Sequence, residues 1–272
     1  MKRIGLLGCG AIGTEIALAI DSGKIPATLT HVYDIERSQA DNLVSKLKQK
    51  PEVVTNSHLL SSNSVELIVE AASQDAVRND AVSILQNKKD MMIMSAGALL
   101  DESVFEVVSD ACKDFGKTVY LPSGAIAGLD ALKSVKDELE SVVLVTTKNP
   151  NSLKGAPFFD SSDIDPEKIS EPTVLFEGTA KEAVSLFPKN VNVSALLSLV
   201  GLGGNNTSVK IVADPNTDKN KHEIKANGKF GDIRIVIENV PDSTNPKTSR
   251  LATLSAIELL RQICTKEVQI GT

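Results

Sequence analysis

The sequence lacks several features that mark other classes of protein. It contains no tryptophan, and aromatic residues make up 3% of its 272 residues, so the stacking surfaces typical of single-stranded nucleic-acid binders are scarce. No apolar run approaches the roughly 20 residues that a bilayer-spanning helix needs. The formal net charge of −6 argues against a broad nucleic-acid footprint. We therefore expect neither a nucleic-acid nor a membrane partner.

Cysteine and histidine are also sparse, which limits metal and redox chemistry. The three cysteines, Cys9, Cys112 and Cys264, are widely spaced, a pattern that predicts neither a disulfide framework nor a clustered metal site. With three histidines and no cysteine or carboxylate cluster near them, we do not expect a protein-bound metal. This cysteine usage fits a reduced, cytoplasmic setting.

The first 121 residues alternate short apolar runs with helical patterns. Runs such as Ile4–Leu7 are nearly continuous, which is typical of strands buried on both faces of a sheet. Stretches such as Ala11–Ser22 carry apolar residues at helical spacing. This alternation predicts an α/β, Rossmann-type domain with a doubly wound parallel sheet. The other expected strands are Leu29–Tyr33, Val65–Ala71, Met91–Met94 and Val119–Leu121, and the other expected helices are Arg37–Gln49 and Ala76–Gln86.

The pattern changes after Leu121 and predicts a second, α+β domain. Asn227–Gly228 is a strong hairpin signal and is expected to join the last two strands. The expected strands are Val142–Thr147, Ser208–Ala213, His222–Ala226 and Ile233–Val240, and the expected helices are Ala180–Phe187 and Val193–Val200. A terminal helix, Ser249–Ile263, is expected to return to the first domain. Its predicted apolar face consists of Leu251, Leu254, Ile257, Leu260 and Ile263. The predicted domains are 1–122 plus 246–272, which binds a dinucleotide, and 123–245, which carries the substrate and catalytic groups.

The sequence GCGAIG matches the G-x-G-x-x-G pattern, and it lies between a predicted strand and a predicted helix, as a dinucleotide site requires. Gly8 permits the tight turn, Gly10 lets the backbone approach a pyrophosphate, and Gly13 lets the helix and strand pack closely. The helix begins at Ala11 and Ile12, where unpaired N–H groups and the positive dipole end favour phosphates. These five residues are the predicted pyrophosphate site.

Asp34 ends the second predicted strand, where a carboxylate can accept hydrogen bonds from ribose hydroxyls. It lies 26 residues beyond Gly8 (34 − 8), a spacing compatible with one βαβ crossover. In a purely structural alternative, the glycines only form a tight turn and Asp34 is a solvated residue at the end of a strand. The combination of the turn, the helix that follows it and the acidic residue after the second strand favours a cofactor site. Because Arg37 nearby could accommodate a 2′-phosphate, the expected cofactor is NAD or NADP.

His222 is the most informative single residue of the second domain. Strand alternation places it with Ile224 and Ala226 on one face, while charged residues share the other face. An imidazole on an apolar face needs a hydrogen-bond partner or a chemical role, and a hydrogen-bonded core histidine is the competing interpretation. His31 and His58 show no comparable pattern.

Two further segments have residues suited to a cofactor. Ser123–Asp130 (SGAIAGLD) supplies the small residues needed where the backbone packs against a planar cofactor ring. The alternative is that its glycines only allow the chain to cross from one domain to the other. Asn190–Asn192 precedes a predicted helix. An amide contact from Asn192 to a cofactor is compatible with its simpler role as a helix cap.

Together these segments resemble the L-aspartate dehydrogenase family over essentially the whole chain. G-x-G-x-x-G is shared with many dehydrogenases, whereas SGAIAGLDA, NVN and HEI in this order are more specific. The segments that carry the resemblance are GCGAIG, SAGAL at Ser95–Leu99, SGAIAGLDAL at Ser123–Leu132, NVNVSA at Asn190–Ala195, ADP at Ala213–Pro215, HEIKANGKFG at His222–Gly231 and NPKTSRLATLSAI at Asn245–Ile257.

The resemblance implies a reaction and roles for individual residues. L-Aspartate, NAD(P)+ and water would give oxaloacetate, ammonia and NAD(P)H through iminoaspartate, in a step that feeds NAD biosynthesis, and the enzyme would be a homodimer. His222 would be the catalytic residue, since a neutral histidine near pH 7 can accept a proton. Asn192 and Ala125 would contact the cofactor. Lys148 is our candidate for a substrate carboxylate, with an ordinary solvated lysine as the alternative.

Two other functions remain open at this point. One is a different Rossmann-type reductase that acts on an imine or semialdehyde of another acidic metabolite. A thiol-acylating aldehyde dehydrogenase is disfavoured, because Cys9 lies in the phosphate turn and no cysteine lies in a candidate catalytic loop. The other is a non-catalytic, NAD(H)-sensing binding protein, against which the histidine on the apolar face argues.

Overall fold

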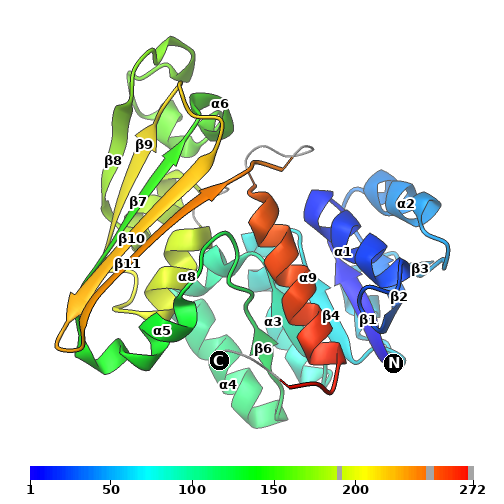
Figure 1. Cartoon of the computed structure of the whole chain (residues 1–272). Helices are drawn as coiled ribbons and strands as arrows, with labels where there is room; N and C mark the ends of the chain where they lie inside the picture. Colours follow the sequence, from blue (N-terminus) through cyan, green and yellow to red (C-terminus); the bar gives the residue numbers. More distant parts are fainter. Residues whose placement is uncertain (189–191, 243–247, 269–272) are drawn as a thin grey trace. The chain divides into compact units, whose positions relative to one another are not determined.

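The computed structural model describes residues 1–188, 192–242 and 248–268. The chain forms two compact units, drawn in Figure 1. The first unit contains 1–122 and 253–268, and the second contains the described residues between 123 and 252. Asn190 and Val191 of the NVNVSA segment, and 245–247 of the NPKTSRLATLSAI segment, lie outside the described residues.

The sheet of the first unit is parallel and has six strands in the order β3-β2-β1-β4-β5-β6. The strand order reverses between β1 and β4, as in a doubly wound dinucleotide-binding fold. The predicted Rossmann-type fold is therefore confirmed. The strands are β1 (Lys2–Leu7), β2 (Ala27–Tyr33), β3 (Glu52–Val53), β4 (Leu67–Glu70), β5 (Asp90–Ile93) and β6 (Val119–Tyr120).

The terminal helix completes the core of the first unit. Ala256, Ile257 and Leu260 of α9 belong to one hydrophobic cluster with residues of β1, α1 and β2. Leu254, which the sequence pattern places on the apolar face, is 41% exposed, because Thr253 and Ala256 face the core instead. None of the described helices is long and apolar enough to cross a membrane. The α-helices are α1 (Ala11–Asp21), α2 (Arg37–Lys46), α3 (Gln74–Gln86), α4 (Glu102–Phe115) and α9 (Arg250–Cys264).

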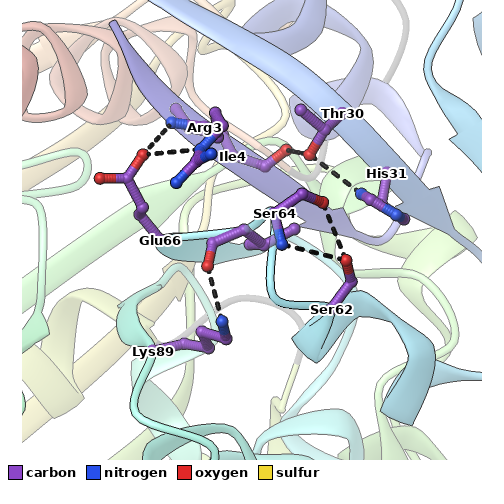
Figure 2. Close-up of polar contacts among 9 residues, drawn as sticks. Arg3, Ile4, Thr30, His31, Ser62, Ser64, Glu66 and Lys89 are labelled. Carbon is purple, nitrogen blue, oxygen red and sulfur yellow. Dashed lines mark hydrogen bonds and ion pairs between the residues drawn. The ribbon is translucent and has the colours of Figure 1, made fainter.

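Polar contacts join the strands at the N-terminal edge of this sheet (Figure 2). Nε of Arg3 lies 3.1 Å from Oε2 of Glu66 and links β1 to the start of β4. Nζ of Lys89 donates a 2.7 Å hydrogen bond to the carbonyl of Val65. Figure 2 also shows His31 on β2, whose Nδ1 lies 3.0 Å from the hydroxyl of the preceding threonine. His31 and Lys89 therefore have structural partners away from the glycine turn.

The second unit is built on a mixed sheet with the strand order β11-β10-β7-β9-β8. β7 and β9 are parallel, and the other neighbouring pairs are antiparallel. This architecture confirms the predicted α+β fold, although β8 has no counterpart among the predicted strands. The strands are β7 (Leu139–Lys148), β8 (Thr173–Thr179), β9 (Thr207–Ala213), β10 (Asn220–Gly228) and β11 (Gly231–Asn239), and the helices are α5 (Leu129–Ser134), α6 (Pro150–Leu153), α7 (Ala180–Leu186) and α8 (Asn192–Val200).

The hairpin between β10 and β11 exists as predicted, but its predicted turn is wrong. β10 continues through Gly228, which pairs with Gly231, so the two-residue loop is Lys229–Phe230 rather than Asn227–Gly228. Gly231 has a φ of +118° and supplies the positive φ at the start of β11.

Contacts with β7 explain why Asn227 and Gly228 belong to the strand. The side-chain oxygen of Asn227 accepts a hydrogen bond from the hydroxyl of Ser141 on β7. A Cβ on Gly228 would clash with the backbone carbonyl of Glu138. Gly228 is therefore required for the close approach of β10 to the start of β7, a tertiary reason that local sequence does not reveal.

One face of this sheet is buried and is called the inner face below. Along β7 its residues are Val142, Leu144, Thr146 and Lys148, and along β10 they are Asn220, His222, Ile224 and Ala226. Cross-strand neighbours follow the same order, with Leu144 opposite Ile224 and Thr146 opposite His222. The buried side chains of both strands are therefore apolar at one end of the inner face and polar at the other. We call Thr146, Lys148, Asn220, His222 and Asn239 the polar end of the inner face.

Candidate active site

The glycine turn of the first unit shows a different constraint at each glycine. Gly8 has a φ of +100°, and a Cβ there would lie 2.6 Å from the backbone carbonyl of Ala71. A Cβ on Gly13 would clash with the carbonyl of Gly8. A Cβ on Gly10, in contrast, would meet nothing within 4 Å. Gly8 and Gly13 are therefore required by packing, whereas Gly10 leaves open space beside the turn.

The N-terminus of α1 opens onto the same space. The cap residue, Gly10, has no side chain to accept hydrogen bonds from the first helical amides. The helix then begins at Ala11 and Ile12 and runs for 11 residues, long enough for its dipole to favour an anion at this end. An open backbone surface next to uncapped amides is what a pyrophosphate requires, so these residues fit a dinucleotide.

Asp34 is held in a fixed orientation beside the glycine turn. Its Oδ2 accepts a 2.7 Å hydrogen bond from the backbone N–H of Cys9, and its Oδ1 accepts a 2.9 Å bond from that of Glu36. Each carboxylate oxygen keeps a second lone pair, so Asp34 can still accept hydrogen bonds from ribose hydroxyls. Arg37 is exposed and pairs with Asp41, its Nε lying 3.0 Å from Oδ1.

Glu70 closes β4 at the same edge of the sheet and is fully buried. Burial raises the pKa of its carboxyl group, while hydrogen bonds from the backbone and from Ser95 act in the opposite direction. Oε1 accepts from the N–H of Ala72 at 2.7 Å and from the hydroxyl of Ser95 at 2.8 Å. Oε2 accepts from the N–H of Met94 and of Ser95. Glu70 therefore joins the loops that follow β4 and β5.

The thiol of Cys9 has no nucleophilic character in this turn. It is 2% exposed, and burial, with the charge of Asp34 as the second cause, raises its pKa to about 12. The thiol is therefore protonated at neutral pH.

His222 lies on the inner face of the second unit and is 1% exposed. Its Nδ1 lies 3.0 Å from Oγ1 of Thr146, which is opposite it on β7. Burial and, second, the charge of Lys148 lower the pKa of His222 to about 3. The ring is therefore neutral near pH 7, and in the free protein it is a weak base.

Lys148 ends β7 on the same face, two residues beyond Thr146, and is 3% exposed. The competing interpretation of Lys148 as a solvated lysine is therefore wrong, because strand alternation carries it into the buried face. Burial lowers its pKa to about 8. The ammonium group is still mostly charged at pH 7, where it places a positive charge close to the histidine.

Two asparagines complete the polar end. Asn220 and Asn239 form a cross-strand pair between β10 and β11. Nδ2 of Asn220 donates to the hydroxyl of Ser249 at 3.2 Å, while its Oδ1 is buried without a hydrogen-bond partner among the described residues. Nδ2 of Asn239 donates a 2.9 Å hydrogen bond to the carbonyl of Ala125. The SGAI segment is thereby tied to the sheet that carries His222.

The other two predicted cofactor contacts lie in the second unit. Ala125 is 6% exposed and is flanked by Gly124 and Gly128, which have φ values of +65° and +74°. Asn192 is half-buried and is the first residue of α8. Their roles toward a cofactor stay predictions.

Sequence reasoning missed four polar residues of these sites: Glu70, Thr146, Asn220 and Asn239. The alternation that picked out His222 also applies to β7, where Thr146 and Lys148 are in phase with two apolar residues, so it could have found Thr146. An acidic residue closing an apolar strand is the corresponding signal for Glu70. Asn239 gave no such signal, since its partner is a backbone carbonyl far away in the sequence. No cluster of three metal-ligating side chains occurs in the part of the chain that the structure describes.

These features define a class of protein. A doubly wound sheet with a glycine turn, open helix amides and an acidic residue after the second strand binds a dinucleotide at its carboxyl edge. The second unit adds a buried neutral histidine and a buried lysine on neighbouring strands. Together they match the components expected of a pyridine-nucleotide-dependent oxidoreductase.

Comparisons with known proteins agree on a narrower assignment. A family model described as "Homoserine dehydrogenase, NAD binding domain" matches 8–122, and one described as "Aspartate dehydrogenase, C-terminal" matches 130–263. The chain is 66% identical to the L-aspartate dehydrogenase of Nitrosopumilus maritimus and 46% identical to that of Methanocella arvoryzae, over 100% of both chains in each case. The crystal structure of aspartate dehydrogenase from Thermotoga maritima has a TM-score of 0.77 and 30% identity, and it covers 99% of both chains.

The chain belongs to the L-aspartate dehydrogenase family. The resemblance inferred from the sequence segments is therefore confirmed. A scyllo-inositol dehydrogenase from Lactobacillus casei with bound NAD(H) shares the fold, with a TM-score of 0.60 and 16% identity.

Proposed function

We propose that this chain catalyses the NAD(P)+-dependent oxidative deamination of L-aspartate to oxaloacetate and ammonia, through iminoaspartate. The observation that carries the proposal is the polar end of the inner face, where a neutral histidine and a lysine are buried on neighbouring strands. The substrate is supported by the relatives named L-aspartate dehydrogenase. In this proposal the first unit binds the dinucleotide and the second unit holds the substrate.

Lys148 binds one carboxylate of the substrate. Its buried ammonium group has been removed from bulk water, which lowers its pKa to about 8. A carboxylate placed beside it would stabilise the charged form, because an opposite charge in a poorly solvated site interacts strongly. The site therefore favours a substrate that carries a carboxylate.

His222 accepts the proton released from the substrate nitrogen. A bound oxidised nicotinamide would supply the acceptor for the hydride that leaves the substrate Cα with the electron pair of the C–H bond. Nε2 of His222 takes up a proton from the substrate ammonium group, and this frees the nitrogen lone pair that forms the C=N bond as the C–H bond breaks. Nε2 then returns to the neutral state by passing the proton to solvent. Water adds to the imine carbon and ammonia leaves, which gives oxaloacetate.

Lys148 also sets the basicity of His222. Its positive charge helps to lower the pKa of the free histidine to about 3. A substrate carboxylate bound at Lys148 offsets this charge, so the histidine becomes a stronger proton acceptor once substrate is present. The arrangement therefore couples substrate binding to the activation of the base.

Six residues of the first unit would hold the cofactor. Gly8, Gly10 and Gly13 shape the turn, and the amides of α1 at Ala11 and Ile12 would bind the pyrophosphate. The carboxylate of Asp34 would accept the ribose hydroxyls, and its negative charge would repel a 2′-phosphate. Asp34 therefore favours NAD over NADP. The backbone near Ala125 and the amide of Asn192 would contact the nicotinamide half.

The proposal extends to the setting in which the enzyme works. We infer from the family resemblance that it is a homodimer in the cytoplasm and that its product feeds NAD biosynthesis. Light scattering on the purified chain tests the dimer, because a single species of about twice 28.9 kDa is expected. A monomer at working concentration would refute it.

The test of the reaction follows the absorbance of the reduced nicotinamide. We expect turnover with L-aspartate and NAD+, and weaker turnover with NADP+. Glutamate, alanine and the imine or semialdehyde forms of other acidic metabolites serve as competing substrates. If one of these compounds is turned over faster than aspartate, that compound is the substrate. If NAD+ binds but none of the compounds is turned over, the chain is a sensing protein.

A further inference from the structure

The hydroxyl of Thr146 is the polar group that fixes the ring of His222. The Oγ1–Nδ1 distance is 3.0 Å, and the two side chains are 5% and 1% exposed. Among the residues that the structure describes, no other side chain forms a hydrogen bond with this ring. The pair is also in register across β7 and β10, so both Cα positions are held by the ladder.

We propose that Thr146 is a positioning residue, which holds His222 in the tautomer that carries its proton on Nδ1 and leaves Nε2 as the acceptor. This inference rests on the proposed function of His222 as proton acceptor. A neutral imidazole has one donor and one acceptor nitrogen, and a hydroxyl can either accept from or donate to Nδ1. The proposed role of His222 needs a free lone pair on Nε2, and it selects the arrangement in which Nδ1–H donates to Oγ1. If Nδ1–H donates to Oγ1 of Thr146, the lone pair of Nε2 is available to the substrate.

The alternative arrangement would be unproductive. If the threonine hydroxyl donated to Nδ1, Nε2 would carry the proton and could not accept another from the substrate. The neighbouring charge acts on the number of protons, because the ammonium of Lys148 disfavours a second proton anywhere on the ring. His222 therefore stays neutral, and its single proton must be placed correctly.

Three variants test the inference. In Thr146→Val the shape is nearly retained and the hydroxyl is lost, and we expect kcat to fall roughly 10-fold, the effect of one hydrogen bond. Thr146→Ser retains the hydroxyl and should restore most of kcat. Thr207→Val is the matched control. Thr207 is also a fully buried threonine on this sheet, but its hydroxyl donates to the carbonyl of Gly203 at 2.9 Å. This control should lose stability without losing kcat per folded molecule.

Nitrogen NMR of histidine-labelled protein gives a readout that does not depend on turnover. The chain has three histidines, so comparison with His222→Gln identifies the signals of His222. We expect a protonated Nδ1 and an unprotonated Nε2 in the wild type, and a shift toward protonated Nε2 in Thr146→Val but not in Thr207→Val.

The outcomes separate this inference from the proposed reaction. A wild type that binds NAD+ but does not oxidise aspartate would refute the reaction, while the NMR signals would still decide the tautomer. An active wild type with a protonated Nε2 would overturn the role of Thr146. Wild-type kcat and unchanged His222 signals in Thr146→Val would overturn it as well.

Discussion

Replacing Lys148 by methionine should make the protein more stable and less active. Burial lowers the pKa of Lys148 to about 8 from an ordinary 10.5. At 1.36 kcal/mol per pKa unit, this difference corresponds to roughly 3 kcal/mol of unfavourable free energy at pH 7, where the folded chain must bury the charged form. Methionine has a similar length and no charge. Because some polar contacts of the lysine are lost as well, we expect a net gain of roughly 1–3 kcal/mol.

The sign of the pH dependence follows from the same pKa. Between pH 8 and 10.5 the unfolded lysine is protonated and the folded one is neutral, so the stability of the wild type rises with pH in this window. The advantage of Lys148→Met is therefore complete below about pH 8 and disappears near pH 10.5. Lys148→Met also removes the charge that helps to lower the pKa of His222, but burial, the larger cause, remains and keeps this histidine neutral throughout the window.

Urea denaturation at pH 7 and pH 10.5 measures this difference. Circular dichroism is the suitable probe, since the chain has no tryptophan. Lys225→Met is the control, because Lys225 is exposed on β10 and its loss changes the net charge equally. The KM for aspartate should rise at least 10-fold in Lys148→Met alone. A Lys148→Met protein no more stable than the wild type at pH 7, or an advantage of equal size at pH 10.5, would refute the reasoning.

Three further predictions concern the cofactor turn and the histidine. Gly10→Val should abolish NAD binding in a folded protein, because its side chain would fill the open space beside the turn; unchanged NAD affinity by calorimetry would exclude the turn from the site. Asp34→Ser should raise the ratio of kcat/KM with NADP to that with NAD, since a carboxylate repels a 2′-phosphate, and an unchanged ratio would mean that another residue reads the ribose. His222→Ala should lower kcat by roughly 10²–10⁴ with little change in NAD affinity; a variant that melts well below the wild type yet turns over normally would instead identify a core histidine.

Local sequence patterns predicted a feature correctly where that feature depends on a single strand or a single turn. The strand–glycine turn–helix sequence at Gly8 predicted the start of the Rossmann fold, and alternation along β10 predicted the buried side of His222. The structure places both as expected. Both features could be predicted because the sequence pattern and the structural feature lie within the same few residues.

Features that depend on distant contacts were not predictable in this way. The turn after β10 was misplaced because Gly228 is required by the carbonyl of Glu138, far away in the sequence. Leu254 was placed on the wrong side of α9, since a helix that packs onto a sheet buries the residues that face it, including Thr253, rather than all of its apolar ones. The partnership of Thr146 with His222 required the register of two strands.

The return of α9 to the first unit has a consequence for synthesis on the ribosome. The nucleotide-binding unit begins to emerge before the second unit, but Ala256, Ile257 and Leu260 of its hydrophobic cluster follow the whole second unit in the sequence. Until these residues are translated its core is incomplete, whereas every strand of the second unit's sheet precedes them and has already been synthesised. Domains usually fold in the order of their emergence, but here the first unit must wait until the second has been translated.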